Sequence, residues 1–182
     1  MSEDREAARI IDRRAGETPS PLDRNPQLRA FIECWLETFI LQGTVDVRLR
    51  QLTILRLAWR SNQPFEWANH YKLAVRSGVT DDEVRAVQRH DYDAALDDAA
   101  RVVVRAADEV IDVGYLTPET YAACGEIFDD PGVLHEFVHV AAGYRMQATI
   151  LNTTRPSVVA AKLPWWPPDG VGPDGATSPP DA

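Results

Sequence analysis

Only two cysteines occur in the 182 residues, Cys34 and Cys124, and they lie far apart in the chain. They form no CxxC pair, so the sequence indicates neither a disulfide framework nor a dithiol redox motif. We expect both to be buried, reduced thiols. The length is sufficient for one domain whose hydrophobic core needs neither disulfides nor metals.

Positive charge is also scarce, since 19 Lys and Arg residues are outnumbered by 28 Asp and Glu residues and the net charge is −9. A nucleic-acid surface would need clustered Lys and Arg, so we expect no such partner. No apolar run approaches the roughly 18 residues of a membrane-spanning helix, and the acidic, polar N-terminus does not have the pattern of a signal peptide. We therefore expect a cytoplasmic protein with no membrane partner.

A period-two alternation of apolar and polar residues is absent as well, so the sequence predicts an all-α fold. Most of the expected helices begin at a capping residue or a proline, and two end at a glycine. They are expected over 28–41, from Asp46, from Gln63-Pro64 to Gly78, after Thr80 over 83–89, from Asp91 or Asp93 to Gly114, from Thr117-Pro118, and from Asp130-Pro131 to about 152, with a short turn or helix at 157–162.

The two ends of the chain differ in composition from the middle. Residues 1–26 are charged and interrupted by proline, so we expect a flexible arm with a brief helix around 7–13. Residues 164–182 are rich in proline and glycine and predict a disordered or draped tail. In that tail, Trp165-Trp166 is expected to pack on the body or on a neighbouring subunit. We expect the remaining residues, 27–163, to form one helical domain.

The most informative residues lie between 49 and 84. Glu66 and His70 are one helical turn apart and fall on the inward side of their helix, where an unpaired charge would be costly. On the preceding helix, Gln51 lies within an apolar stripe formed by Val47, Ile54, Leu55 and Ala58. A buried amide needs hydrogen-bond partners, and the acid–imidazole pair is the obvious candidate. We therefore predict that three polar groups point into one pocket lined by aromatic rings.

The same stretch resembles the carboxymuconolactone decarboxylase family, which includes the alkylhydroperoxidase D-like proteins. The resemblance lies in the motifs Arg50-Gln51-Leu52-Thr53-Ile54-Leu55-Arg56, Glu66-Trp67-Ala68-Asn69-His70, Ala74, Gly78-Val79-Thr80 and Glu83-Val84. It implies an alkylhydroperoxidase D-like helical bundle of about six to eight helices. It also implies a homo-oligomer, expected to be a trimer or hexamer, with a dimer as the alternative.

The two branches of that family imply different chemistry. The peroxidase branch uses a glutamate, two cysteines of a CxxC and a histidine, and these positions carry over to Gln51, Gln63, Glu66 and His70, which include no thiol. Thiol peroxidase chemistry is therefore not expected. The decarboxylase branch has a glutamate four residues before the histidine, as here. The resemblance thus implies a cofactor-free acid/base enzyme acting on a small organic acid, lactone or cyclic enone by decarboxylation, isomerisation or hydration.

We assign Glu66, His70 and Gln51 as candidate catalytic residues. Glu66 is expected to hold the His70 tautomer and favour its protonated form, and His70 to move a proton to or from the substrate. Gln51 is expected to hydrogen-bond a substrate oxygen without adding charge. The candidate substrate-binding residues are the other side chains expected to line the pocket, namely Trp59, Gln63, Trp67, Tyr71 and His139.

Two alternatives stay open. A family member that had lost the catalytic relay would be a non-catalytic binding or assembly protein, and Glu66 with His70 would be a structural ion pair. Residues 135–139, with His135 and His139 at the ends, have the HExxH pattern of zinc hydrolases. No His or Glu follows them in the sequence to supply a third ligand, so we assign no metal site.

Overall fold

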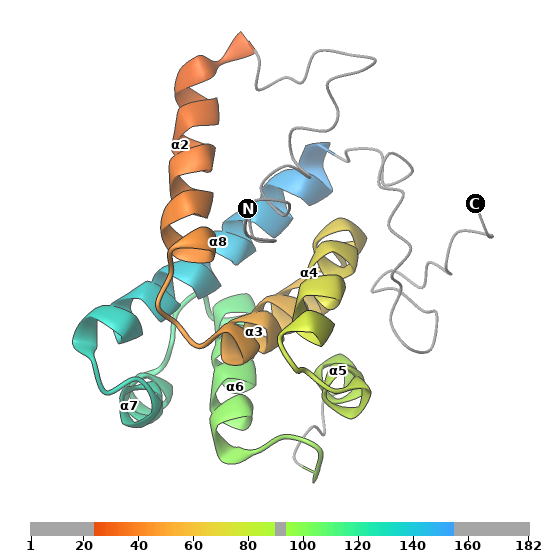
Figure 1. The fold of residues 1–182 in the computed structure, drawn as a ribbon, viewed down its shortest axis with the longest axis vertical. Coiled ribbons are helices and arrows are strands. Elements are labelled where there is room, and N and C mark those ends of the chain that lie inside the picture. The colour runs from red at the N-terminus through yellow and green to blue at the C-terminus, as the bar shows by residue number, and fades with distance from the viewer. Residues whose placement is uncertain (1–23, 90–93, 155–182) are drawn as a thin grey trace, which may run out of the picture. The chain divides into compact units, whose positions relative to one another are not determined.

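The computed structural model describes residues 24–89 and 94–154, and these residues form helices and connecting turns with no strand. The predicted all-α fold is confirmed. The elements are α2 (Pro26–Leu36), a π-helical turn η2 (Glu37–Leu41), α3 (Val47–Arg60), α4 (Pro64–Arg76), α5 (Asp81–Gln88), α6 (Asp98–Asp112), α7 (Pro118–Ile127) and α8 (Pro131–Thr154) (Figure 1). None of these helices is both long enough and apolar enough to span a membrane.

The chain divides into two compact units between Thr44 and Val45. In the first unit, Trp35 on α2 packs against Phe39 on η2 with their ring centroids 5.6 Å apart. The single helix predicted over 28–41 is therefore two elements, because the hydrogen-bond pattern widens from α to π at Glu37.

The two cysteines differ in their surroundings. Cys34 on α2 is exposed, so the expectation of a buried thiol is wrong there. The physical reason is that α2 buries only its neighbour, Trp35. Cys124 on α7 is buried as expected, and burial raises the pKa of its thiol to about 11. A thiol held protonated in this way is a poor nucleophile.

Several predicted helix starts are confirmed by their caps. The side chains of Asp46, Thr80 and Thr117 each accept a hydrogen bond from a backbone N–H three residues further along. Thr80 and Glu83 also complete a capping box at the start of α5.

The start of α6 was predicted wrongly. Its N-cap is Asp97, whose carboxylate accepts a hydrogen bond from the Ala100 N–H at 2.8 Å. The sequence offers several aspartates upstream of this helix, and propensity alone does not distinguish them. The predicted caps Asp91 and Asp93 lie outside the described residues, as do the expected segments 7–13 and 157–162, most of the expected arm, and the whole of the expected tail with Trp165-Trp166.

Helix α3 is the centre of the second unit. It contacts α4, α5, α6 and α8 (Figure 1), and all the residues from Leu49 to Ala58 are buried. The predicted one-sided stripe is therefore wrong in part, because this helix is enclosed on every side. Val47, assigned to that stripe, is 45% exposed because it lies in the first turn, before the enclosed stretch. Each polar side chain within the stretch needs a partner inside the protein.

Arg56 has the most extensive set of such partners and is 1% exposed. Its Nε and Nη2 donate to the two carboxylate oxygens of Asp108 on α6, at 2.6 and 3.0 Å. Its Nη1 donates at 2.7 Å to the carbonyls of Val87 and Arg89. Arg60, one turn further along α3, also donates to Asp108 at 2.6 Å. The cluster joins α3 to α6 and to the C-terminal end of α5.

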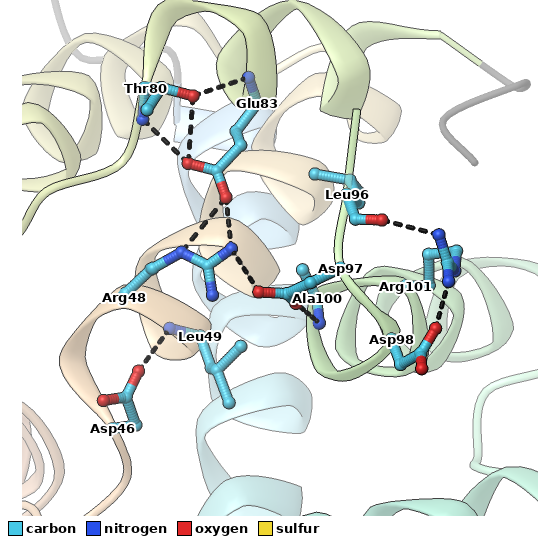
Figure 2. Close-up of polar contacts among 10 residues, drawn as sticks. All are labelled: Asp46, Arg48, Leu49, Thr80, Glu83, Leu96, Asp97, Asp98, Ala100 and Arg101. Atoms are coloured by element: carbon cyan, nitrogen blue, oxygen red, sulfur yellow. Dashed lines mark hydrogen bonds and ion pairs between the residues drawn. The ribbon is translucent and has the colours of Figure 1, made fainter. Parts of the chain in front are cut away.

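A second polar cluster joins the starts of three helices, as Figure 2 shows. Arg48, in the first turn of α3, donates to Glu83 of the α5 capping box, and its Nη2 lies 3.0 Å from the carboxylate of Asp97, the α6 cap. The Ala100 N–H and the Arg48 guanidinium hold the pKa of the Asp97 carboxyl below its usual value, although burial opposes them. Arg48, in the first turn of α3, binds both the capping-box glutamate of α5 and the N-cap aspartate of α6. The starts of the three helices therefore stabilise one another.

We predict that Arg56→Ala strongly destabilises the protein. The change leaves a buried carboxylate and two carbonyls without their donor, and breaking a buried pair of this kind costs about 3 kcal/mol or more. The matched control is Arg85→Ala, which removes an exposed ion pair with Asp82 and should cost at most about 1 kcal/mol. Urea denaturation of both variants gives the free energies of unfolding. Equal losses in the two variants would contradict the structural role assigned to Arg56.

Candidate functional site

Helix α4 presents an acid and a histidine on the same side. It begins where the sequence predicts, with Gln63 as N-cap and Pro64 in the first helical position. One turn separates Glu66 from His70, and the Glu66 Oε2 lies 3.4 Å from the His70 Nε2. Their side chains are 13% and 7% exposed. The pair is therefore enclosed, and the carboxylate is the more accessible member.

Gln51 on α3 contacts the opposite nitrogen of the imidazole. Its Oε1 lies 2.8 Å from the His70 Nδ1, and both side chains are buried. With the amide in this orientation, its oxygen accepts a hydrogen bond from an Nδ1–H of His70. Gln51 thus contacts the imidazole through its side-chain oxygen.

This arrangement leaves Nε2 as the nitrogen of His70 that faces the Glu66 carboxylate. A neutral imidazole with hydrogen on Nδ1 has its lone pair on Nε2, and an imidazolium donates its Nε2–H towards the Glu66 carboxylate. One proton can therefore move between His70, Glu66 and a bound molecule. The sequence assigned control of the tautomer to Glu66. In the structure, Gln51 lies next to Nδ1 and Glu66 next to Nε2, so both side chains contact the imidazole.

Two residues of the site were missed in the sequence. Tyr144 on α8 is buried, and its ring lies edge to face with that of His70 at a centroid distance of 4.9 Å. Burial and then the charge of Glu66 raise the pKa of Tyr144 well above its usual value, while the charge of Arg50 lowers it. The phenol is therefore held uncharged. Arg50 is buried on α3 and brings positive charge to the same group of side chains.

A sequence signal for Tyr144 did exist. Buried residues of α8 recur at intervals of three and four, at Leu134, Phe137, Ala141, Tyr144 and Ala148. That periodicity assigns Tyr144 to the inward side of its helix. No comparable signal marks Arg50, because a helix enclosed on every side has no polar face against which a buried arginine would be conspicuous.

The three aromatic residues predicted to bind substrate lie within or beside the hydrophobic core. Trp59 packs against Trp67 with ring centroids 5.1 Å apart, and Trp67 and Tyr71 belong to the core itself. The buried indole N–H of Trp67 has no hydrogen-bond partner in residues 24–89 and 94–154. An unpaired buried donor is costly, so an acceptor atom of a bound molecule would be favourable there.

Gln63 and His139, both predicted to bind substrate, have other surroundings in the structure. The Gln63 amide stabilises the fold. Its Oε1 accepts a hydrogen bond from the Phe65 N–H at 2.8 Å, and its Nε2 donates one to the Asn152 side chain on α8 at 2.9 Å. His139 is exposed, so the expectation that it lines the site is wrong. The reason is helical geometry, because about 140° around the α8 axis separates His139 from Tyr144, which contacts His70.

The HExxH residues of the sequence lie in the first turns of α8. Within the described ranges, no three His, Cys, Asp or Glu side chains are grouped so that they could hold a metal ion. Glu136, which would be the general base of such a centre, accepts a hydrogen bond from the Val45 N–H at 3.1 Å.

Comparison with known proteins gives the family. Residues 27–109 match the carboxymuconolactone decarboxylase family, and this stretch contains Gln51, Glu66 and His70. Residues 27–109 therefore carry the sequence pattern of the carboxymuconolactone decarboxylase family. No curated protein and no solved structure matches the chain at a significant level. The family match ends at residue 109, so Tyr144 on α8 lies beyond it and the match assigns this residue no role.

We predict that the ring of Tyr144 keeps the His70 imidazole in one orientation. Tyr144→Leu removes the ring and should allow the imidazole to sample both neutral tautomers, whereas Tyr144→Phe keeps the ring and should preserve the Nδ1–H form. Two-bond 1H–15N spectra of histidine-labelled protein distinguish the tautomers at a pH that keeps the imidazole neutral. His70→Gln identifies the signals. A Leu variant whose spectrum still shows a single Nδ1–H tautomer would exclude the positioning role.

Proposed function

We propose that this protein is a cofactor-free acid/base enzyme, a lyase or isomerase, acting on a small organic acid, lactone or cyclic enone. The observation that carries the proposal is the position of His70, between Gln51 at 2.8 Å and Glu66 at 3.4 Å in a mostly buried cluster. A histidine with one nitrogen fixed and the other facing a carboxylate is suited to general acid/base catalysis. The residues of this chain supply all the groups that the proposed step needs.

In the proposed decarboxylation, the bond between the substrate carbon and its carboxylate breaks, the carboxylate leaves as CO2, and the electron pair of the bond passes into an enolate. The NH2 group of Gln51 donates to the enolate oxygen, and Nε2–H of His70 transfers its proton to the carbon. In an isomerisation, neutral His70 instead removes a proton from one carbon through Nε2 and returns it to another. Glu66 faces Nε2 in both cases and stabilises the imidazolium.

Two further features support an anionic intermediate. Arg50 brings a buried positive charge to the site, and preorganised charges or donors near a developing oxyanion are effective because they need no reorganisation. Tyr144, held uncharged by burial, places an aromatic wall beside the imidazole without adding negative charge to it. Both features favour a substrate that carries a carboxylate or forms an enolate.

We predict that His70→Gln lowers turnover by about 10²- to 10⁴-fold, the usual contribution of a general acid or base. A panel of β-keto acids, unsaturated lactones and cyclic enones is incubated with the protein in D2O. NMR then detects loss of the carboxylate, migration of a double bond, or deuterium incorporation next to the carbonyl. Glu66→Gln should reduce the same activity, because it removes the carboxylate that faces Nε2.

The matched control is His90→Gln, the same chemical change at a histidine that no motif singles out. It should keep the activity of the unmodified protein. Unchanged turnover in folded His70→Gln would refute the acid/base proposal. Binding of a panel compound without turnover, and with equal affinity in His70→Gln, would instead indicate the non-catalytic binding role.

A further inference from the structure

The His135–His139 pair on α8 is a feature that the proposed reaction does not use. Both residues are exposed, they are one helical turn apart, and their ring centroids are 4.7 Å apart. Two histidines at this spacing on a helix can present their imidazoles to one ion. Since α8 is a continuous helix from Pro131 to Thr154, the backbone holds the two residues one turn apart on the same side of the helix.

The tautomer of His139 is determined by its own helix. Its Nδ1 lies 2.9 Å from the backbone oxygen of His135. A carbonyl oxygen only accepts, so Nδ1 carries the hydrogen and Nε2 carries the lone pair. Metal-binding histidines are commonly oriented in this way, with one ring N–H donated to a backbone carbonyl and the other nitrogen on the ion.

Glu136 does not complete a hydrolase centre around this pair. Its carboxylate accepts a hydrogen bond from the Val45 N–H at 3.1 Å, and no third His, Cys, Asp or Glu joins the two histidines in the described part of the chain. An ion held here would therefore have two protein ligands and would complete its coordination with water. Such a site binds an ion at the surface rather than activating water in a closed cleft.

We propose that His135 and His139 form a surface site for one divalent transition-metal ion that prefers imidazole, such as Cu²⁺, Ni²⁺ or Zn²⁺. These ions bind neutral imidazole well, whereas Mg²⁺ and Ca²⁺ select oxygen ligands. The net charge of −9 favours accumulation of cations near the protein. The site is separate from the Gln51–Glu66–His70 cluster, so its test does not depend on the proposed function.

Isothermal titration calorimetry with Cu²⁺, Ni²⁺ or Zn²⁺ chlorides tests the proposal on the full chain. One ion per chain should bind, and His135→Gln and His139→Gln should each weaken binding by at least about tenfold, because each removes one arm of the chelate. His90→Gln controls for non-specific histidine binding and should leave the affinity unchanged. Mg²⁺ should give no binding that depends on either histidine.

Electron paramagnetic resonance of the Cu²⁺ complex counts the ligands independently. The unmodified protein should show two coordinated imidazole nitrogens, and each single variant one or none. Both substituted side chains are exposed, so circular dichroism should show that the variants keep their helical content. Absence of saturable binding, or equal affinity in all three variants and the unmodified protein, would overturn the proposal.

Discussion

The enclosure of α3 is the constraint on which the rest of the second unit depends. This helix is surrounded by four others, yet its buried stretch contains two arginines, a glutamine and a threonine. Buried polar groups without partners are costly, so the neighbouring helices must supply acceptors and donors at matching positions. Asp108 on α6 and the carbonyls at the end of α5 do this for Arg56, and His70 on α4 does it for Gln51. Thr53 is satisfied by the Leu49 carbonyl of its own helix.

The same constraint explains why the candidate site is well defined. Its members come from three helices, with Gln51 and Arg50 on α3, Glu66 and His70 on α4, and Tyr144 on α8. Contacts near both ends of α8 keep that helix in place. Glu136 binds the Val45 N–H, and Asn152 bonds with Gln63 and the Ser61 carbonyl. Because Gln63 is the α4 cap, the turn that starts the Glu66–His70 helix is bound directly to the helix that carries Tyr144.

Much of this arrangement could be predicted from local patterns. The cap at Asp46, the Pro64 start and the Thr80–Glu83 box are short-range signals, since each depends on residues within one turn. The meeting of Gln51 with Glu66 and His70 was also foreseeable, because a polar residue within an apolar stripe implies a buried partner.

The errors arose where the answer depends on distant parts of the chain. The helical periodicity of α3 does not reveal that four helices surround it. For this reason Arg50 was missed and Val47 was assigned to the buried stripe. His139 was assigned to the site on the strength of a motif, although its position around α8 relative to Tyr144 excludes it. Sequence spacing also does not reveal which nitrogen of His70 lies next to Gln51 and which next to Glu66.

A double-mutant cycle between Gln51 and His70 tests the central claim most directly. Gln51→Leu, His70→Leu and the double variant are compared with the unmodified protein by urea denaturation. If the two side chains are hydrogen-bonded to each other inside the helix cluster, each single substitution leaves one buried polar group unpaired. The loss of unfolding free energy in the double variant should then differ from the sum of the two single losses by about 1 kcal/mol or more. Additive losses would mean that the two side chains do not interact, and would contradict the account of both the fold and the site.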